Sequence, residues 1–193
     1  MIKFVLTAAL ALAAGTARAE QIDPARIISA ATGDWNGDGE GDLSLLVAPP
    51  EAGDDIGIYL YLRDQDHALL RLAGTAPGKV WGNGSLDGMF GQDPSIEALP
   101  GGSIAVHSQN SGIGRSRWEQ TLTIAYRNDQ FVVAGYTYSY YDTLDTSDNG
   151  TCDYNILTGN VTTKGKRSKV DGKTIAVADW NDDVGQKACG REQ

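Results

Sequence analysis

The stretch GDWNGDGEGDLSLLV, residues 33–47, decides how the rest of this chain is interpreted. Four oxygen-bearing side chains and one carbonyl occupy positions 1, 3, 5, 9 and 7 of a tight turn: Asp34, Asn36, Asp38, Asp42 and the main chain of Glu40. Alternate residues of a sharp turn direct their side chains toward one centre, and the intervening glycines tolerate positive φ. Because three converging carboxylates repel one another, the pattern predicts one bound Ca²⁺ ion.

An EF-hand and a metal-free turn are two other interpretations of this loop. An EF-hand needs a bidentate Glu at position 12, where this chain has Leu45 inside an apolar run, and that excludes the motif. A metal-free turn built from Asx and glycine residues stays open.

With the apolar strand that follows it, the loop resembles one FG-GAP or VCBS-type repeat, whose signature is DxDGDGxxDL followed by a strand. The resemblance covers residues 27–72 and implies the same five ligand positions, with Asn36 where many members carry Asp. The family usually strings several such repeats into a β-propeller. Only one complete copy is present here, so the resemblance implies a single blade-like unit.

Residues 1–19 have the features of a signal peptide. Lys3 precedes the apolar stretch FVLTAALALAA, and Ala17-Arg18-Ala19 has the small-x-small pattern of a cleavage site. The apolar stretch is too short for a stable membrane span. We therefore expect a periplasmic or secreted protein that begins near Glu20.

The charge of the mature chain limits the partners it can have. Removal of Lys3 and Arg18 leaves 14 basic and 25 acidic residues, a net charge of -11 instead of -9. This argues against nucleic acid and anionic membranes as partners and leaves an unknown protein or glycan.

Cys152 and Cys189 are the only cysteines of the chain. In an exported protein they are expected to form a disulfide, which stabilises the fold by roughly 3 to 4 kcal/mol on the chain-entropy estimate. Two buried free thiols are the alternative.

The strand pattern indicates an all-β fold. Residues 20–73 contain four apolar segments in an antiparallel meander around the calcium loop, and residues 95–193 form a second antiparallel region with a long hairpin. Between them, the glycine-rich residues 74–94 are expected to form a long loop, with Trp81, Met89 and Phe90 anchoring it or lining a groove. We expect one domain in which both parts share a core.

The hairpin contains the strongest strand signal. In RWEQTLTIAYR, the apolar or aromatic residues Trp118, Leu122, Ile124 and Tyr126 alternate with the polar residues Arg117, Glu119, Thr121 and Thr123. Asn128-Asp129 then turns the chain into QFVVAGYTYSYYD. A two-residue turn places Tyr136, Tyr138 and Tyr140 on the face away from the core, beside Arg117, where they form a possible partner surface. A three-residue turn buries them with Trp118.

Few residues suggest catalysis. His67 and His107 lie in separate strand-like segments, and no GxSxG or HExxH motif accompanies them. Asp93 and Glu97 are possible acids of a hydrolase, but nothing pairs them.

Segment 179–185 repeats positions 1, 3 and 5 of the first loop with Asp179, Asn181 and Asp183, and we expect a turn there, with a second cation as the alternative. The basic stretch 164–169, KGKRSK, is expected to be a solvated turn.

Three functions fit these observations. The preferred one is a calcium-stabilised binding or accessory protein of the cell envelope. The second is an inhibitor of a secreted enzyme such as lysozyme, because the stretch SQNSGIGRSRW, residues 108–118, is similar to the Ser-Gly segments with which periplasmic lysozyme inhibitors enter their target. The third is a glycan hydrolase with unidentified acids. We expect no enzyme activity.

Overall fold

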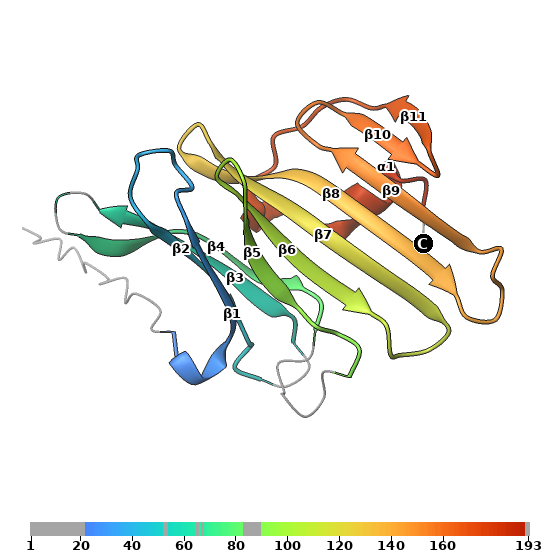
Figure 1. Cartoon of the computed structure of the whole chain (residues 1–193), viewed down its shortest axis with the longest axis horizontal. Helices are drawn as coiled ribbons and strands as arrows, with labels where there is room; N and C mark the ends of the chain where they lie inside the picture. The colour runs from blue at the N-terminus through green and yellow to red at the C-terminus, as the bar shows by residue number, and fades with distance from the viewer. Residues whose placement is uncertain (1–21, 52–53, 65, 67, 83–89, 192–193) are drawn as a thin grey trace, which may run out of the picture.

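The computed structural model describes residues 22–51, 54–64, 66, 68–82 and 90–191, and these residues are mostly β (Figure 1). The predicted signal peptide lies outside the described residues. The strands form two antiparallel sheets, which confirms the all-β fold class. No helix among the described residues has the length and apolar character to cross a membrane.

The first sheet is the meander expected around the 33–42 loop. Its four strands pair in sequence order: β1 (Ile27–Gly33), β2 (Asp42–Val47), β3 (Ile56–Asp64) and β4 (Leu69–Val80). The predicted loop 74–94 begins too early, because β4 continues to Val80 and pairs with Ile56. The pairing of β4 with β3 is irregular between Ile56 and Ile58, opposite Pro77 and Gly78, and again between Leu60 and Tyr61. β4 is an edge strand, where an unpaired proline nitrogen is tolerated.

The second sheet has seven strands, which also pair in sequence order: β5 (Ser95–Leu99), β6 (Ser103–Asn110), β7 (Ser116–Arg127), β8 (Gln130–Asp142), β9 (Asn149–Asn155), β10 (Asn160–Thr163) and β11 (Lys166–Lys169). The stretch 164–169, expected to be a turn, therefore contains a strand. It pairs only with β10 and is fully exposed. Its lysines and arginine suit an edge strand, because charge there opposes pairing with another chain.

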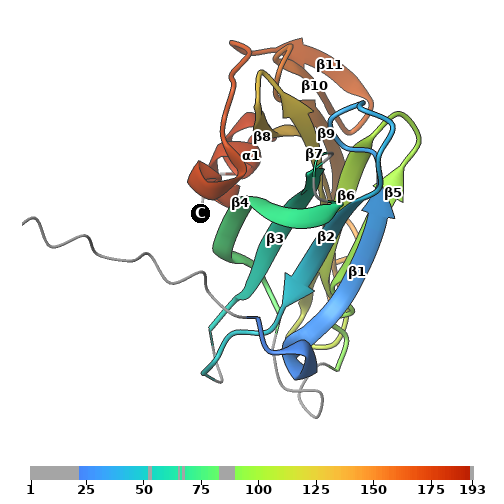
Figure 2. The same cartoon turned by 90° about the vertical axis from the view of Figure 1, so that its left-hand side faces the viewer.

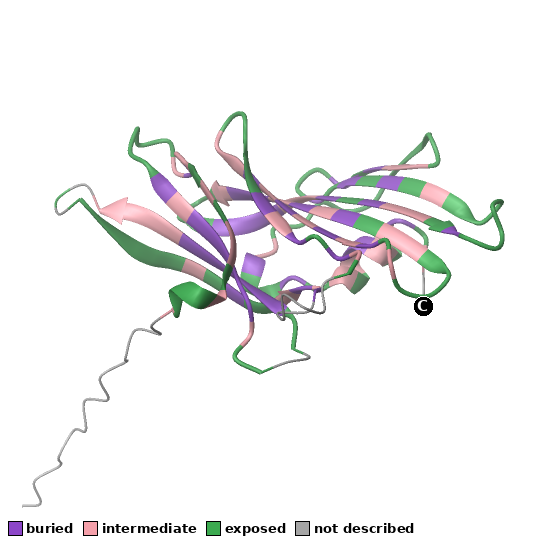
Figure 3. Cartoon of the chain, turned by 60° about the horizontal axis from the view of Figure 1, so that its bottom comes forward, coloured by how far each residue is buried: buried purple, intermediate pink, exposed green. Residues whose placement is uncertain are grey.

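The two sheets lie face to face and share one core (Figure 2). Ile58 and Leu60 of the first sheet belong to the same buried cluster as Ile104, Leu122 and Val133 of the second. Buried positions accordingly lie on strands of both sheets (Figure 3). This shared core supports the expectation of one domain.

The long hairpin forms as predicted, but a bulge changes which face its tyrosines occupy. Asn128 and Asp129 form a two-residue turn, both with positive φ, and Ile124 pairs with Val133. The register then shifts, so that Thr123 pairs with Gly135 and Ala134 is left between the two pairs. Beyond this bulge every residue of β8 has changed faces.

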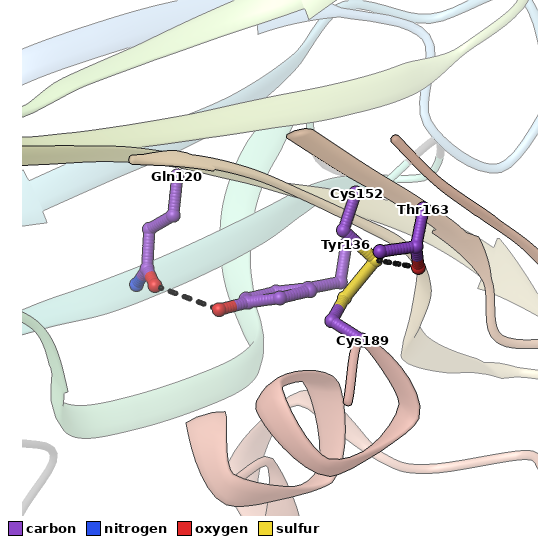
Figure 4. The surroundings of a disulfide bond; sticks show 5 residues. All are labelled: Gln120, Tyr136, Cys152, Thr163 and Cys189. Atoms are coloured by element: carbon purple, nitrogen blue, oxygen red, sulfur yellow. Dashed lines mark hydrogen bonds between the residues drawn. A yellow bond between two sulfur atoms is a disulfide. The ribbon is translucent and has the colours of Figure 1, made fainter. Parts of the chain in front are cut away.

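The C-terminal residues pack against the second sheet. A 3-10 helix, η3 (Val177–Asp179), is followed by α1 (Asp182–Ala188), which begins with Asn181 as its N-cap. The expected turn at 179–185 is thus the start of a helix. The predicted disulfide is confirmed: Cys189, next to the end of α1, is bonded to Cys152 of β9 (Figure 4).

Candidate functional site

The 33–42 loop curls around the side chain of Asp34. One Asp34 oxygen accepts hydrogen bonds from the backbone N–H groups of Gly37 and Asp38, and the other accepts from Gly39. The Asn36 side chain lies in the same turn and donates to an oxygen of Asp38 at 2.8 Å. Gly37 and Gly39 both have positive φ, as expected of a turn this tight.

Asp42, the fourth predicted ligand side chain, has a different environment. It is buried, and its two carboxylate oxygens accept from the backbone N–H groups of Trp35 and Arg63 at 2.8 and 2.9 Å. It thereby joins the loop to β3. Glu40 is exposed, and its backbone N–H donates to a carboxylate oxygen of Asp38. Within the described ranges, no group of three or more His, Cys, Asp or Glu side chains is close enough to hold a metal ion.

Trp35 anchors this loop to the core. Its ring is buried and lies against Gly33, where an added Cβ would come within 2.3 Å of the ring. On the other side, the Asp34 carbonyl lies against Gly102, in the turn between β5 and β6. A Cβ added to Gly102 would come within 2.7 Å of the Asp34 carbonyl oxygen. The loop is therefore held between the two sheets, and both glycines are needed for the close approach.

The expected tyrosine surface is not open to solvent. Tyr136 and Tyr138 are only 1% and 7% exposed, and Tyr140 is half-buried. The bulge at Ala134 places all three on the inner face, opposite Leu122, Gln120 and Trp118. Arg117 faces the other way and pairs with Tyr141, so it does not border the tyrosines, and its Nη1 has no partner among the described residues.

The tyrosines instead form part of a stacked aromatic row that the C-terminal segment covers. Neighbouring ring centroids lie 5.0 to 6.3 Å apart in the order Trp81, Trp118, Tyr138, Tyr136 and Trp180, with Tyr140 beside Tyr138. The Arg191 guanidinium lies 3.5 Å from the Tyr140 ring centroid, a cation–π contact. Burial raises the pKa of Tyr136 and Tyr138, so both phenols stay protonated at neutral pH.

The two described ends of the glycine-rich stretch before β5 have different environments. Trp81 packs edge-on against Trp118, which is the anchoring role expected of it. Phe90 is 82% exposed and does not anchor this segment to the core, while Met89 lies outside the described residues.

A more favourable site is the loop between β6 and β7, residues 111–115. Asn110 precedes it and is buried. Its side-chain amide donates to the carbonyls of Ile113 and Ser116 at 2.8 and 3.0 Å, while its side-chain oxygen accepts from the Ile113 N–H at 2.8 Å. One side chain thus satisfies three backbone groups, and the loop is held in one conformation although it is exposed.

Neighbouring segments support the same loop from both sides. The Ser111 N–H donates to the Gly91 carbonyl, and Gly91 and Gly112 approach so closely that a Cβ on Gly91 would lie 2.4 Å from the Gly112 nitrogen. On the other side, Arg115 donates to Asp142 at 2.6 Å. The hydrogen bond from Arg115, helped by backbone N–H groups, lowers the pKa of Asp142 to about 2.

These contacts gather exposed apolar side chains at one end of the second sheet. Phe90 contacts Gly112, Ile113 is 51% exposed in the supported loop, and Leu144 is 78% exposed two residues beyond Asp142. We call Phe90, Ile113 and Leu144 the loop end. The sequence indicates two parts of it, Phe90 as a possible groove residue and the stretch 108–118 as a possible inhibitor loop, whereas Leu144 lies in a polar stretch without a strand pattern.

The residues considered for catalysis remain apart. His107 faces the outer side of the second sheet with its Nδ1 3.9 Å from Glu119, and His67 lies outside the described residues. Asp93 is exposed and accepts a hydrogen bond from Gln109, and Glu97 is exposed on β5. This arrangement offers no described pair of acids in a cleft.

Comparisons with known proteins add little to this geometry. No protein-family model matches the chain, and no curated protein matches it significantly. A solved structure titled "Structure of a Xanthomonas Type IV Secretion System related protein" aligns with a TM-score of 0.41 and 15% sequence identity. The alignment covers 74% of this chain and 58% of that one, so the chain spans somewhat over half of its length.

Proposed function

We propose that the protein is an exported binding protein of the cell envelope that contacts a protein partner through the loop end. The observation that carries this proposal is a set of exposed apolar side chains, Phe90, Ile113 and Leu144, on loops held by partly buried hydrogen bonds. Large apolar groups at the centre of a polar surface are typical of binding sites. A loop already held in one conformation loses little entropy on binding.

Export is supported by the signal-like sequence of residues 1–19 and by the disulfide between Cys152 and Cys189. Disulfides persist mainly in oxidising compartments such as the periplasm and the extracellular space. The acidic balance of the chain favours a protein partner with a neutral or basic surface.

A site-specific photocrosslinker at Ile113 tests this proposal in the producing cells. We expect one defined protein adduct, formed at a lower yield when Leu144→Asp is added. The same crosslinker at Leu69, an exposed position on β4 of the other sheet, is the matched control. Equal adducts from both positions, or none from Ile113, would refute the loop end as the binding surface.

The same loop favours a second function, inhibition of a secreted enzyme such as lysozyme. The Asn110 hydrogen bonds present Ser111–Arg115 as a rigid exposed loop, which is the form in which many inhibitors enter an active site. Lysozyme rates with and without the protein test this. We expect the inhibition to fall at least tenfold for Ile113→Asp, whereas unchanged lysozyme rates with a tenfold excess of wild-type protein would exclude it.

Calcium binding by the 33–42 loop belongs to the proposal as a stabilising feature. Asp34, Asn36 and Asp38 share one turn and would hold the ion, while Asp42 links the loop to β3. We expect Ca²⁺ to raise the Tm of the purified protein and a chelator to lower it, because an ion that binds only the folded state stabilises it. Asp34→Asn with Asp38→Asn should remove the response. A Tm independent of Ca²⁺ would leave the metal-free turn as the correct interpretation.

A further inference from the structure

A pocket lies on the C-terminal side of the second sheet, away from the loop end. It has a volume of about 470 Å³, is open to solvent on one side, and is lined by residues of β9, of the segment 170–173 and of α1. Its apolar part is formed by Tyr154, Val170, Val184 and Ala188. Volumes of this order suit a small organic ligand.

The walls of the pocket are fixed before any ligand arrives. Residues 170–173 are attached to the turn between β9 and β10 by hydrogen bonds from the Val170 N–H to Gly159 and from the Lys173 N–H to Ile156, at 2.9 and 2.8 Å. A Cβ on Gly159 would lie 2.0 Å from the Val170 carbonyl, so the two segments are in close contact. The disulfide holds α1 in place on the opposite side.

The pocket is lined by one hydroxyl group to which no described residue hydrogen-bonds. Tyr154 is only 2% exposed and lines the pocket, and its hydroxyl has no hydrogen bond to any described residue. The ring of Tyr154 is buried, whereas its hydroxyl is not among the buried atoms that lack a partner, so the hydroxyl is open to water or to a ligand in the pocket. Burial raises the pKa of Tyr154, which keeps the phenol protonated and able to donate.

The rim of the pocket is charged but balanced. Lys173 and Lys187 bring two positive charges, and Asp171 and Asp183 bring two negative ones. None of the four forms an ion pair with another described residue. A ligand with a net charge would lose hydration on binding. This rim has no surplus of the opposite charge to compensate for that loss.

We propose that this pocket binds a small organic molecule of no net charge, with an apolar body about the size of a phenyl ring and an oxygen that accepts from the Tyr154 hydroxyl. The apolar body lies against Val170, Val184 and Ala188. The ligand is thus defined by three properties: apolar bulk, a hydrogen-bond acceptor and zero net charge.

The experiment uses three probes of equal size on the full mature chain: 3-phenylpropanol, 3-phenylpropionate and 3-phenylpropylamine. Amide chemical shifts are followed by NMR during titration. We expect saturable shifts confined to residues around 154, 170–173 and 184–188 with the alcohol, and at least threefold weaker binding of the two charged probes. Shifts that do not saturate or that lie elsewhere would overturn the site, and equal affinity for all three probes would overturn the assignment of a neutral ligand.

Two variants test the pocket directly. Val170→Trp fills it from an exposed position and should abolish binding, and Tyr154→Phe should weaken binding about threefold to tenfold through the lost hydrogen bond. Ile113→Ala, at the loop end, is the control that should bind like the wild type. Wild-type affinity in a folded Val170→Trp variant, verified by its Tm, would show that the probe binds elsewhere.

Discussion

At the scale of single residues, the loop end depends on side chains that are themselves hidden. Asn110 is buried and bonds three backbone groups of the exposed loop, and Asp142 accepts from Arg115 and from the backbone of residues 144 and 145. Polar residues at strand ends often compete with regular pairing by bonding nearby backbone in this way. The shape of the proposed binding surface is therefore determined by buried residues that are not part of it.

Asn110→Ala should lower the free energy of unfolding by about 1 to 3 kcal/mol, because it leaves the carbonyls of Ile113 and Ser116 and the N–H of Ile113 without partners. Amide hydrogen exchange in residues 111–115 should accelerate. Urea denaturation and exchange measured by mass spectrometry check both effects. Asn149→Ala, whose exposed side chain makes one bond to Thr146, is the control and should change stability by no more than about 0.5 kcal/mol. Equal effects of both substitutions would contradict the scaffold role.

The Arg115–Asp142 pair predicts a pH dependence. The folded-state pKa of Asp142 is about 2, below its ordinary value of 3.8, so its contribution is fully present above pH 4 to 5 and is lost as pH falls through 2. The Tm advantage of the wild type over Asp142→Asn should therefore shrink between pH 5 and pH 2. Thermal unfolding across this range measures it, with Asp153→Asn, an exposed acid on β9, as the control. An advantage that stays constant down to pH 2 would argue against the pair.

At the scale of elements, the alternation of apolar residues was enough to place most strands. It gave the wrong face for the tyrosines of β8, because a local change in backbone geometry determines which face they occupy. The first three strands of the first sheet, the start of β4 and the 128–129 turn are where the pattern predicts them, whereas β4 continues to Val80. The bulge at Ala134 has no signal in QFVVAGYTYSYYD, and one extra residue moved the tyrosines to the core face. The stretch 108–118 and Phe90 were indicated by the sequence, but their arrangement was not, since it comes from hydrogen bonds between segments distant in sequence.

The C-terminal segment that covers the aromatic row, which includes α1, is held in place by the Cys152–Cys189 disulfide. Cys152 and Cys189 are 37 residues apart, and closing a loop of that length stabilises the fold by about 4 kcal/mol on the chain-entropy estimate. Gly185 of α1 lies against the Tyr136 ring, so close that a Cβ would come within 2.6 Å of it. Trp180, in contact with the same ring, reports on this packing.

The double variant Cys152→Ser, Cys189→Ser should lose about 4 kcal/mol of unfolding free energy, and its tryptophan emission should shift to longer wavelength as Trp180 becomes wetter. Urea titration followed by fluorescence measures both. Wild-type protein reduced with dithiothreitol should behave like the variant. If the reduced protein keeps the wild-type emission and midpoint, the disulfide does not hold α1 against the sheet.

At the scale of the whole molecule, the two sheets are joined by more than apolar packing. Lys79 of β4 donates to the Trp180 carbonyl at 2.8 Å, and the Ile96 N–H of β5 donates to the Ser29 hydroxyl of β1 at 3.1 Å. These bonds lie at opposite edges of the first sheet, since β1 and β4 are its outer strands. The 33–42 loop adds a third connection through Trp35 and the turn at Gly102.

Because one core serves both sheets, the protein should unfold in a single transition. Leu60→Ala, at a fully buried position of β3, should cost about 2 to 5 kcal/mol and lower the midpoint equally whether unfolding is followed by far-UV circular dichroism or by the fluorescence of Trp180 in the other half. Leu72→Ala, on the exposed part of β4, should have little effect. Two separate midpoints in Leu60→Ala would mean that the sheets fold independently, and the loop end would then keep its shape when the 33–42 loop is lost.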